Sequence, residues 1–124
     1  MNGTQRVSDA NPIIFQQVDL NIRNGYDPTT GIFVTPVPGV YLFSVAALSQ
    51  EGNHCSLELA RNGKGVATLR AEAVTHRRDQ GTITVLLRLE ELDKVFVRGY
   101  NSNMVSLWGD KHTVFTGVML WALA

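Results

Sequence analysis

The chain has 124 residues, 44% of them hydrophobic, and its 11 Lys and Arg balance its 11 Asp and Glu. A chain of this length buries one sizeable core but rarely two, so we expect a single folded domain. Because the net charge is zero, no summed positive field attracts nucleic acid or an anionic membrane surface, and we predict neither as a partner.

Short apolar runs separated by turn residues predict an all-β chain, since no stretch keeps helical spacing over several turns. No basic and apolar leader opens the sequence as given. The apolar run at 114–124 is far shorter than the roughly 20 residues of a membrane-spanning helix, so we interpret it as a strand and expect no membrane insertion. The predicted strands cover residues 13–20, 31–35, 40–48, 55–61, 64–71, 82–89, 94–100 and 114–121.

Three turns lie between these strands. Asn62-Gly63 predicts a two-residue hairpin, because both positions tolerate a positive φ. Residues 27–31, Asp-Pro-Thr-Thr-Gly, are typical of a turn in which proline presets φ and glycine leads into the next strand. Residues 90–93 carry three carboxylates, which suit acid catalysis, a cation site or a solvated acidic turn, and the solvated turn is favoured.

Two of the predicted strands, 40–48 and 114–121, are apolar on both faces. A two-layer sandwich of this size has one internal core, so the second face of each strand needs another cover. An exposed contiguous apolar patch normally marks an interface, and burying it is worth roughly 25 cal/mol per Å², so we predict a homo-oligomer. On the last strand, Phe115, Met119 and Trp121 are assigned to one side. The predicted interface residues are Val40, Leu42, Val118 and Leu120.

Six short motifs are spread over nearly the whole chain. They are Pro12-Ile13-Ile14-Phe15, Tyr26-Asp27-Pro28-x-Thr30-Gly31-Ile32-Phe33, Pro36-x-x-Gly39-x-Tyr41-x-Phe43, Asn62-Gly63, Asp93-x-Val95-x-Val97 and Phe115-x-Gly117. Together they resemble the globular head of complement C1q, a family that shares its jelly roll with tumour necrosis factor. The resemblance implies a two-sheet jelly-roll sandwich that forms tight trimers, is usually secreted, is often joined to a collagen-like stalk, and recognises ligands without catalysis.

The resemblance divides the chain into a short N-terminal extension, 1–11, and a C1q-like domain, 12–124. The family opens with a strand of the Val-Ala-Phe-Ser-Ala kind, for which Arg6-Val7-Ser8 is a weak substitute. The usual first strand is therefore either lacking or supplied differently, and its loss would leave the edge of the final strand open. The glycine at every third position that a collagen-like stalk needs is absent from the sequence as given.

The same resemblance assigns one candidate metal ligand. Asp79, before the strand at 82–89, occupies the position at which calcium-binding members of the family place an aspartate near the trimer apex. Calcium takes about six to eight oxygen ligands, so threefold symmetry, carbonyls and water would have to complete the shell. The alternative is a loop aspartate paired with a neighbouring arginine. Calcium is the one cofactor that the resemblance implies.

Basic residues in two loops form a candidate ligand surface for sulfated or phosphorylated glycans or for an acidic protein. Loops on rigid scaffolds often carry function, although the same residues are ordinary in any solvated loop. The candidate ligand-binding residues are His76, Arg77, Arg78, Lys111 and His112.

We predict that the protein is not an enzyme. Nucleophilic catalysis needs a base within hydrogen-bond reach of the nucleophile. Cys55 adjoins His54, but neighbours in a strand point to opposite faces, and Cys55 belongs to the apolar face. It is expected to be a buried thiol. No Cys and His cluster with zinc-ligand spacing exists in the sequence.

Two functions therefore remain. The first is a secreted homotrimeric module for innate-immune pattern recognition, which binds microbial, glycan or protein ligands through apical loops and gains strength by avidity. The second is a secreted trimeric signalling or scaffold ligand that engages one cell-surface receptor in the grooves between subunits. The first predicts dependence on surface ligand density, and the second predicts a single protein partner without glycan binding.

Overall fold

The computed structural model describes residues 4–7, 11–49, 54–72, 79–100, 105–108 and 113–123. That part of the chain forms two antiparallel sheets, and its one helical element is a single 3-10 turn, η1 (Ile22–Asn24). None of it forms a helix with the length and apolar character to cross a bilayer. The strands are β1 (Thr4–Val7), β2 (Tyr26–Asp27), β3 (Ile32–Val34), β4 (Gly39–Ser49), β5 (His54–Arg61), β6 (Lys64–Glu72), β7 (Gln80–Leu89), β8 (Lys94–Gly99), β9 (Val105–Trp108) and β10 (Val114–Ala122).

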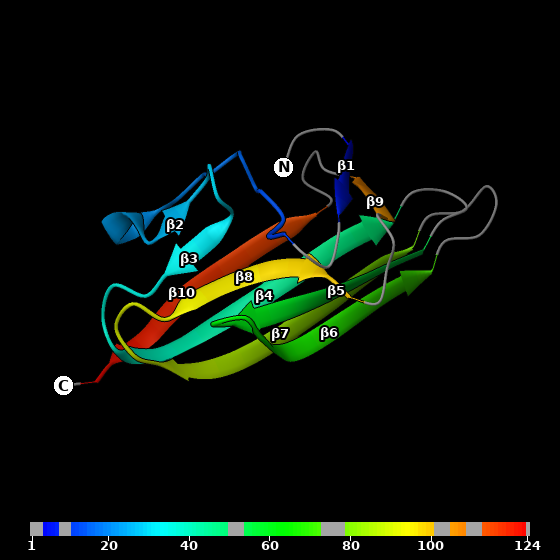
Figure 1. Ribbon diagram of the computed structural model, residues 1–124. Coiled ribbons are helices and arrows are strands. Elements are labelled where there is room, and N and C mark those ends of the chain that lie inside the picture. Colours follow the sequence, from blue (N-terminus) through cyan, green and yellow to red (C-terminus); the bar gives the residue numbers. More distant parts are fainter. Residues whose placement is uncertain are drawn as a thin grey trace.

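The two sheets form the layers of a sandwich. In the first sheet, β10 and β9 pair one after the other with the same edge of β4, β7 pairs with the opposite edge of β4, and β1 pairs with β9. The second sheet has the order β2-β3-β8-β5-β6. In Figure 1, β8, β5 and β6 lie in front of β10, β4 and β7. Strands far apart in the sequence are neighbours in both sheets, as in a jelly roll. The expected two-sheet jelly-roll sandwich is confirmed.

The core lies between the sheets and, in the described residues, contains inward side chains of β4, β5, β6 and β8. Along β4, Tyr41, Phe43 and Val45 point inward and are 3%, 1% and 0% exposed, as the sequence pattern predicts. Phe43 stacks on Phe115 of β10 with ring centroids 5.9 Å apart and meets Phe33 of β3 edge to face at 5.6 Å. Aromatic rings from both sheets therefore join the layers, and such pairs add to the free energy of burial.

The strand expected at 13–20 does not form. Ile13 and Phe15 are buried, but the segment joins no sheet along its length; the Ile13 amide donates to the Val97 carbonyl at 2.7 Å. The Phe15 amide donates to the Tyr26 hydroxyl at 2.9 Å, so a side chain takes the place of a strand neighbour. Beyond Phe15 the apolar residues change phase and are exposed, with Val18 at 37% and Leu20 at 79%.

The predicted hairpin and the turn at 27–31 are present. Asn62 and Gly63 both have positive φ, 51° and 84°, and connect β5 to β6. Gly31 has φ of 79°, and an added Cβ would collide with the carbonyl oxygen of Ile13, so glycine is required there. The carboxylate of Asp27 accepts hydrogen bonds from the Thr29 amide and hydroxyl, which closes the turn.

Three short strands were not predicted: β1, β2 and β9. β1 lies within the segment expected as an extension, and it pairs with β9 instead of with the last strand. Within the described residues β10 pairs with β4 alone, so the expected open edge on the last strand is present in that part of the chain. β2 has only two residues, too few to show an alternation in the sequence.

Candidate interface and ligand-binding residues

The outward faces of β10, β4 and β7 bring apolar side chains from three strands into register. Val118 of β10 lies opposite Leu42 of β4, and Leu42 lies opposite Leu86 of β7. Directly opposite residues of antiparallel strands share one side of the sheet at close Cβ spacing. Val118 is 48% exposed and Leu86 is 61% exposed, so this row is open to solvent in the single chain.

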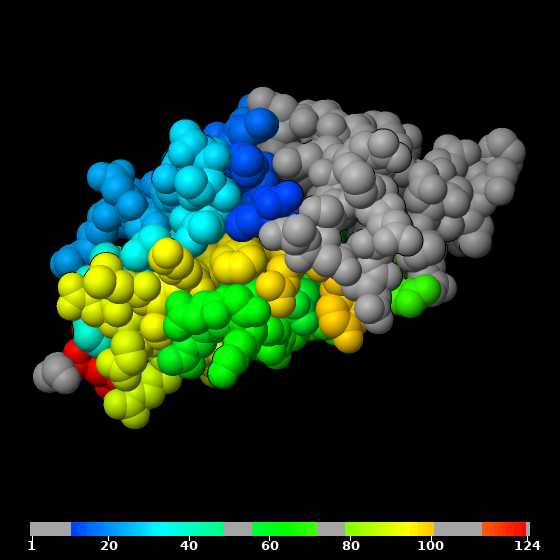
Figure 2. Space-filling model, in the orientation of Figure 1, coloured from blue at the N-terminus to red at the C-terminus, as the bar shows by residue number. Residues whose placement is uncertain are grey.

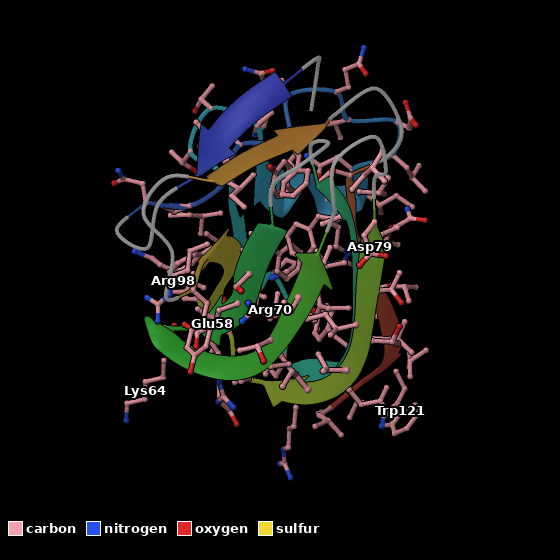
Figure 3. All side chains as sticks on the ribbon, turned by 90° about the vertical axis from the view of Figure 1, so that its right-hand side faces the viewer. Glu58, Lys64, Arg70, Asp79, Arg98 and Trp121 are labelled. Atoms are coloured by element: carbon pink, nitrogen blue, oxygen red, sulfur yellow. The ribbon has the colours of Figure 1, made fainter. Side chains whose placement is uncertain are left out.

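A β-bulge changes the last part of β10. The register shifts between Met119 and Trp121, and Trp121 lies opposite Val40, whose side chain points outward. The assignment of Trp121 to the same side as Phe115 is therefore wrong, because the extra residue reverses the alternation. Trp121 is 55% exposed and Leu120, within the bulge, is 44% exposed. Figure 3 shows Trp121 projecting outward near the end of β10.

We call this surface the β10 face. Its next row along the strands is polar, because Ser44 lies between Thr116 and Thr84, and the Thr84 hydroxyl is 3.4 Å from that of Ser44. The larger apolar side chains lie toward the C-terminal ends of β7 and β10, whereas Val114, 41% exposed and opposite Ala46, is the outward apolar residue at the start of β10. The β10 face consists of Val40, Leu42, Leu86, Val118, Leu120 and Trp121.

The structure brings all four predicted interface residues to this surface or to its bulge, but whether a partner covers them stays a prediction. Sequence reasoning missed Leu86. The outward set of β7 is Gln80, Thr82, Thr84, Leu86 and Arg88, and Leu86 is its single apolar member. The register of β7 on β4, which the sequence does not reveal, is what places Leu86 beside Leu42.

Asp79 is exposed and directly precedes β7, at the opposite end of the sheet from Trp121 (Figure 3). In the described ranges, no three His, Cys, Asp or Glu side chains form a group that could hold a metal ion. Asp79 therefore does not provide a calcium shell with those residues alone. Main-chain carbonyls, water or other subunits would have to supply most of the ligands.

The candidate ligand-binding residues His76, Arg77, Arg78, Lys111 and His112 lie outside the described residues, as do the side chains of His54 and Cys55. The attachment points of the two basic segments are described. β7 and β10 both run antiparallel to β4, with Gln80 opposite Leu48 and Val114 opposite Ala46. Residues 76–78 and 111–112 therefore precede in the sequence two strands that begin at the same end of the sheet, one strand spacing on either side of β4.

In the turn at 90–93, Glu90 and Glu91 are exposed, whereas the carboxylate of Asp93 is held by neighbouring groups and is not free for a cation or for acid catalysis. Asp93 is 14% exposed in its side chain; one carboxylate oxygen accepts from the Asn62 side-chain amide at 3.0 Å. The other accepts from the Glu90 amide at 2.9 Å and lies 3.1 Å from Nη2 of Arg61. We call the contacts of Arg61, Asn62, Asp93 and Lys94 the turn clasp.

Hydrogen bonds within the clasp stabilise the ionised form of Asp93. The pKa of Asp93 lies below its ordinary value of 3.8, first because the side-chain amide of Asn62 donates to the carboxylate. The main-chain amide of Glu90 and the guanidinium of Arg61 lower it further. The main chains are joined too, because the Lys94 amide donates to the Asn62 side-chain oxygen at 2.8 Å and the Asn62 amide donates to the Lys94 carbonyl at 2.8 Å. The acidic turn therefore has a structural role.

A sequence model of the C1q domain matches residues 1–120. The chain belongs to the C1q domain family. C1q-domain proteins are trimeric and often secreted, and the C1q and tumour necrosis factor-like families are recognition or signalling modules, not enzymes.

Two curated relatives match most of the chain. It is 36% identical over 110 residues to Protein HP-25 homolog 1 of Bos taurus and 29% identical over 111 residues to the collagen alpha-1(X) chain of Mus musculus. Each match covers 88% of this chain, but only 50% of the bovine protein and 16% of the mouse protein. The C1q domain here thus corresponds to half or less of these relatives.

Solved structures agree on the fold. The globular domain of zebrafish complement 1qA superposes with a TM-score of 0.83 at 22% identity, covering 98% of this chain and 94% of that one. The Eiger TNF of S. frugiperda superposes with a TM-score of 0.79 at 18% identity, covering 98% and 88%. At these identities the likeness is one of fold.

Proposed function

We propose that this C1q domain is a secreted homotrimeric recognition module, which assembles through the β10 face and binds sulfated or phosphorylated glycans of microbial or other surfaces through basic loops. The observation that carries the proposal is the exposed apolar row of Val118, Leu42 and Leu86 on a sheet whose inner face is already fully used by the core. A patch of this kind on a monomer normally marks an interface.

The basic segments support the ligand-binding part of the proposal. Residues 76–78 and 111–112 precede β7 and β10 at one end of the sheet, and those two strands are about 10 Å apart across β4. Five basic residues thus precede, within four positions in the sequence, strands that begin at one end of the sheet. In a trimer, three such ends on one rigid body bind a patterned anionic surface far more tightly than one does.

Binding to dextran sulfate tests the proposal, with neutral dextran as the reference surface. We expect the protein to bind sulfated dextran coated at high density and to lose most of that binding when the density falls. Arg77→Ala combined with Arg78→Ala should weaken binding roughly tenfold or more, since each arginine contributes a charge-assisted contact. Lys64→Ala combined with Lys94→Ala also removes two exposed cations, at the hairpin end, and should leave binding unchanged.

Equal losses in the two double variants would contradict a ligand site in the basic loops and would indicate general charge attraction. Saturable binding of one receptor protein without any binding to sulfated dextran would support the alternative, a trimeric signalling or scaffold ligand.

A further inference from the structure

The Asn62-Gly63 hairpin tip has a chemical reactivity that is unrelated to ligand binding. Asparagine followed by glycine is the pair in which the next main-chain nitrogen reaches the side-chain carbonyl carbon most easily, because glycine has no side chain to obstruct the approach. The same dipeptide occurs at Asn24-Gly25 and at Asn2-Gly3, and the structure describes the first of these. The two described sites differ in how freely the glycine moves.

Gly63 has space around it. An added Cβ at Gly63 would meet no atom within 4 Å, and the residue is exposed at the hairpin tip. Gly25 is buried, and an added Cβ there would lie 2.6 Å from Cε1 of Phe33. Its carbonyl also accepts from the Val34 amide at 2.8 Å, so the Gly25 peptide is held on both sides.

The turn clasp also places a main-chain donor on the carboxamide oxygen of Asn62. The Lys94 amide donates to Oδ1 of Asn62 at 2.8 Å, where negative charge develops when a nucleophile adds to the carbonyl carbon. A fixed main-chain donor at that position stabilises the tetrahedral intermediate, as in an oxyanion hole. Nδ2 of Asn62 donates to Oδ1 of Asp93 at 3.0 Å, which fixes which side-chain atom faces Lys94. Figure 2 shows the β5–β6 strands, in green, beside β8, in yellow.

We propose that Asn62 is a site of spontaneous deamidation that releases the turn clasp. The deprotonated Gly63 nitrogen forms a bond to Cγ of Asn62, and the bond from Cγ to Nδ2 breaks, so that ammonia leaves with the proton and a succinimide remains. One water molecule then opens the ring at either carbonyl and gives aspartate or isoaspartate. The sum is the exchange of an amide for an acid, with water consumed and ammonia released.

The product cannot keep the clasp. The group that donates to Asp93 becomes a carboxylate oxygen, so two ionised carboxylates face each other at hydrogen-bond distance without a proton between them. Isoaspartate adds a methylene to the main chain of a two-residue turn, which breaks the match between Arg61 and Lys64. Either product frees the hairpin tip from the turn before β8.

Peptide mapping by mass spectrometry tests the site. The folded protein is incubated in mildly alkaline buffer, and the conversion of Asn62 and of Asn24 is followed over time. We expect Asn62 to convert roughly tenfold faster than Asn24, an effect smaller than that of one oxyanion donor in an enzyme. In denaturant, where both glycines are free, the two rates should become similar. Equal rates in the folded protein, or faster conversion at Asn24, would overturn the proposal.

Two variants test the consequence without waiting for the reaction. Asn62→Asp installs the product, and we expect it to lower the urea midpoint of unfolding. Adding Asp93→Asn reverses donor and acceptor across the same contact, so the double variant should recover part of the loss relative to Asn62→Asp. A midpoint for Asn62→Asp equal to that of the unmodified protein would show that deamidation does not release the clasp.

Discussion

At the scale of single residues, Asp93 shows how a surface carboxylate becomes structural. Its pKa lies below the ordinary 3.8 because Asn62, Glu90 and Arg61 all favour the ionised form. A depressed pKa in the folded state means that the ionised carboxylate stabilises the fold at pH values above the unfolded-state pKa. That stabilisation is lost as the pH falls through the folded-state value.

We therefore expect the free energy of unfolding to decrease as the pH falls below about 3.8, and Asp93→Asn to flatten this dependence. Urea unfolding at a series of acidic pH values measures it. Asp27, whose pKa is lowered by hydrogen bonds from Thr29, remains in the variant, so some dependence should persist. Asp27→Asn removes only the contribution of Asp27 and should leave that of Asp93 in place. An Asp93→Asn protein as acid-sensitive as the parent would refute the role given to the clasp.

Several residue roles could be predicted from the sequence, whereas the contacts of the turn clasp could not. The inward residues of β4 and the positive φ at Asn62 and Gly63 are local properties, visible in alternation and in turn chemistry. Asn62 and Asp93 are 31 residues apart, and only the pairing of β5 with β8 brings their turns together. A run of carboxylates read locally therefore indicates solvent exposure, whereas the fold binds one of them.

At the scale of elements, seven of the eight predicted strands are present, and the one at 13–20 is not. The apolar pattern was most informative where a strand pairs with a neighbour along most of its length. The failure at 13–20 has a physical reason: buried Ile13 and Phe15 carry the alternation, but a carbonyl of β8 and the Tyr26 hydroxyl satisfy their amides. The side assigned to Trp121 is the second failure, because the extra residue of the β10 bulge moves this side chain to the outer face. No sequence pattern indicates the bulge.

The same strand provides the test of the interface. We expect Val118→Asp to dissociate the trimer, since it places a charge in the centre of the apolar row of the β10 face, where burial without a partner is costly. Light scattering of the purified variant measures the mass, and circular dichroism verifies that the fold is kept. Val66 of β6 is 41% exposed on the other sheet, so Val66→Asp makes the same chemical change elsewhere.

Val66→Asp should keep the mass of the parent protein. A monomeric parent, or a Val118→Asp variant with unchanged mass, would show that the β10 face is covered in another way.

At the scale of the whole molecule, trimer assembly and calcium binding can be tested by separate measurements. We expect a trimer mass by light scattering, and addition of a calcium chelator should lower the thermal midpoint if Asp79 of each subunit contributes to a shared shell near the threefold axis. Asp79→Asn should remove the effect of the chelator while leaving the trimer intact. A midpoint that is the same with and without chelator in the parent would eliminate calcium and leave the β10 face as the sole basis for assembly.

β7 and β10 start together at one end of the sheet, and the apolar part of the β10 face lies toward their other ends. Length and sequence can therefore vary in the segments before these strands without disturbing the β10 face, through which we propose that the subunits assemble. The domain thus suits loop exchange: a foreign peptide inserted before Asp79 or before the buried Thr113 would be displayed three times on a trimer, all copies facing the same way.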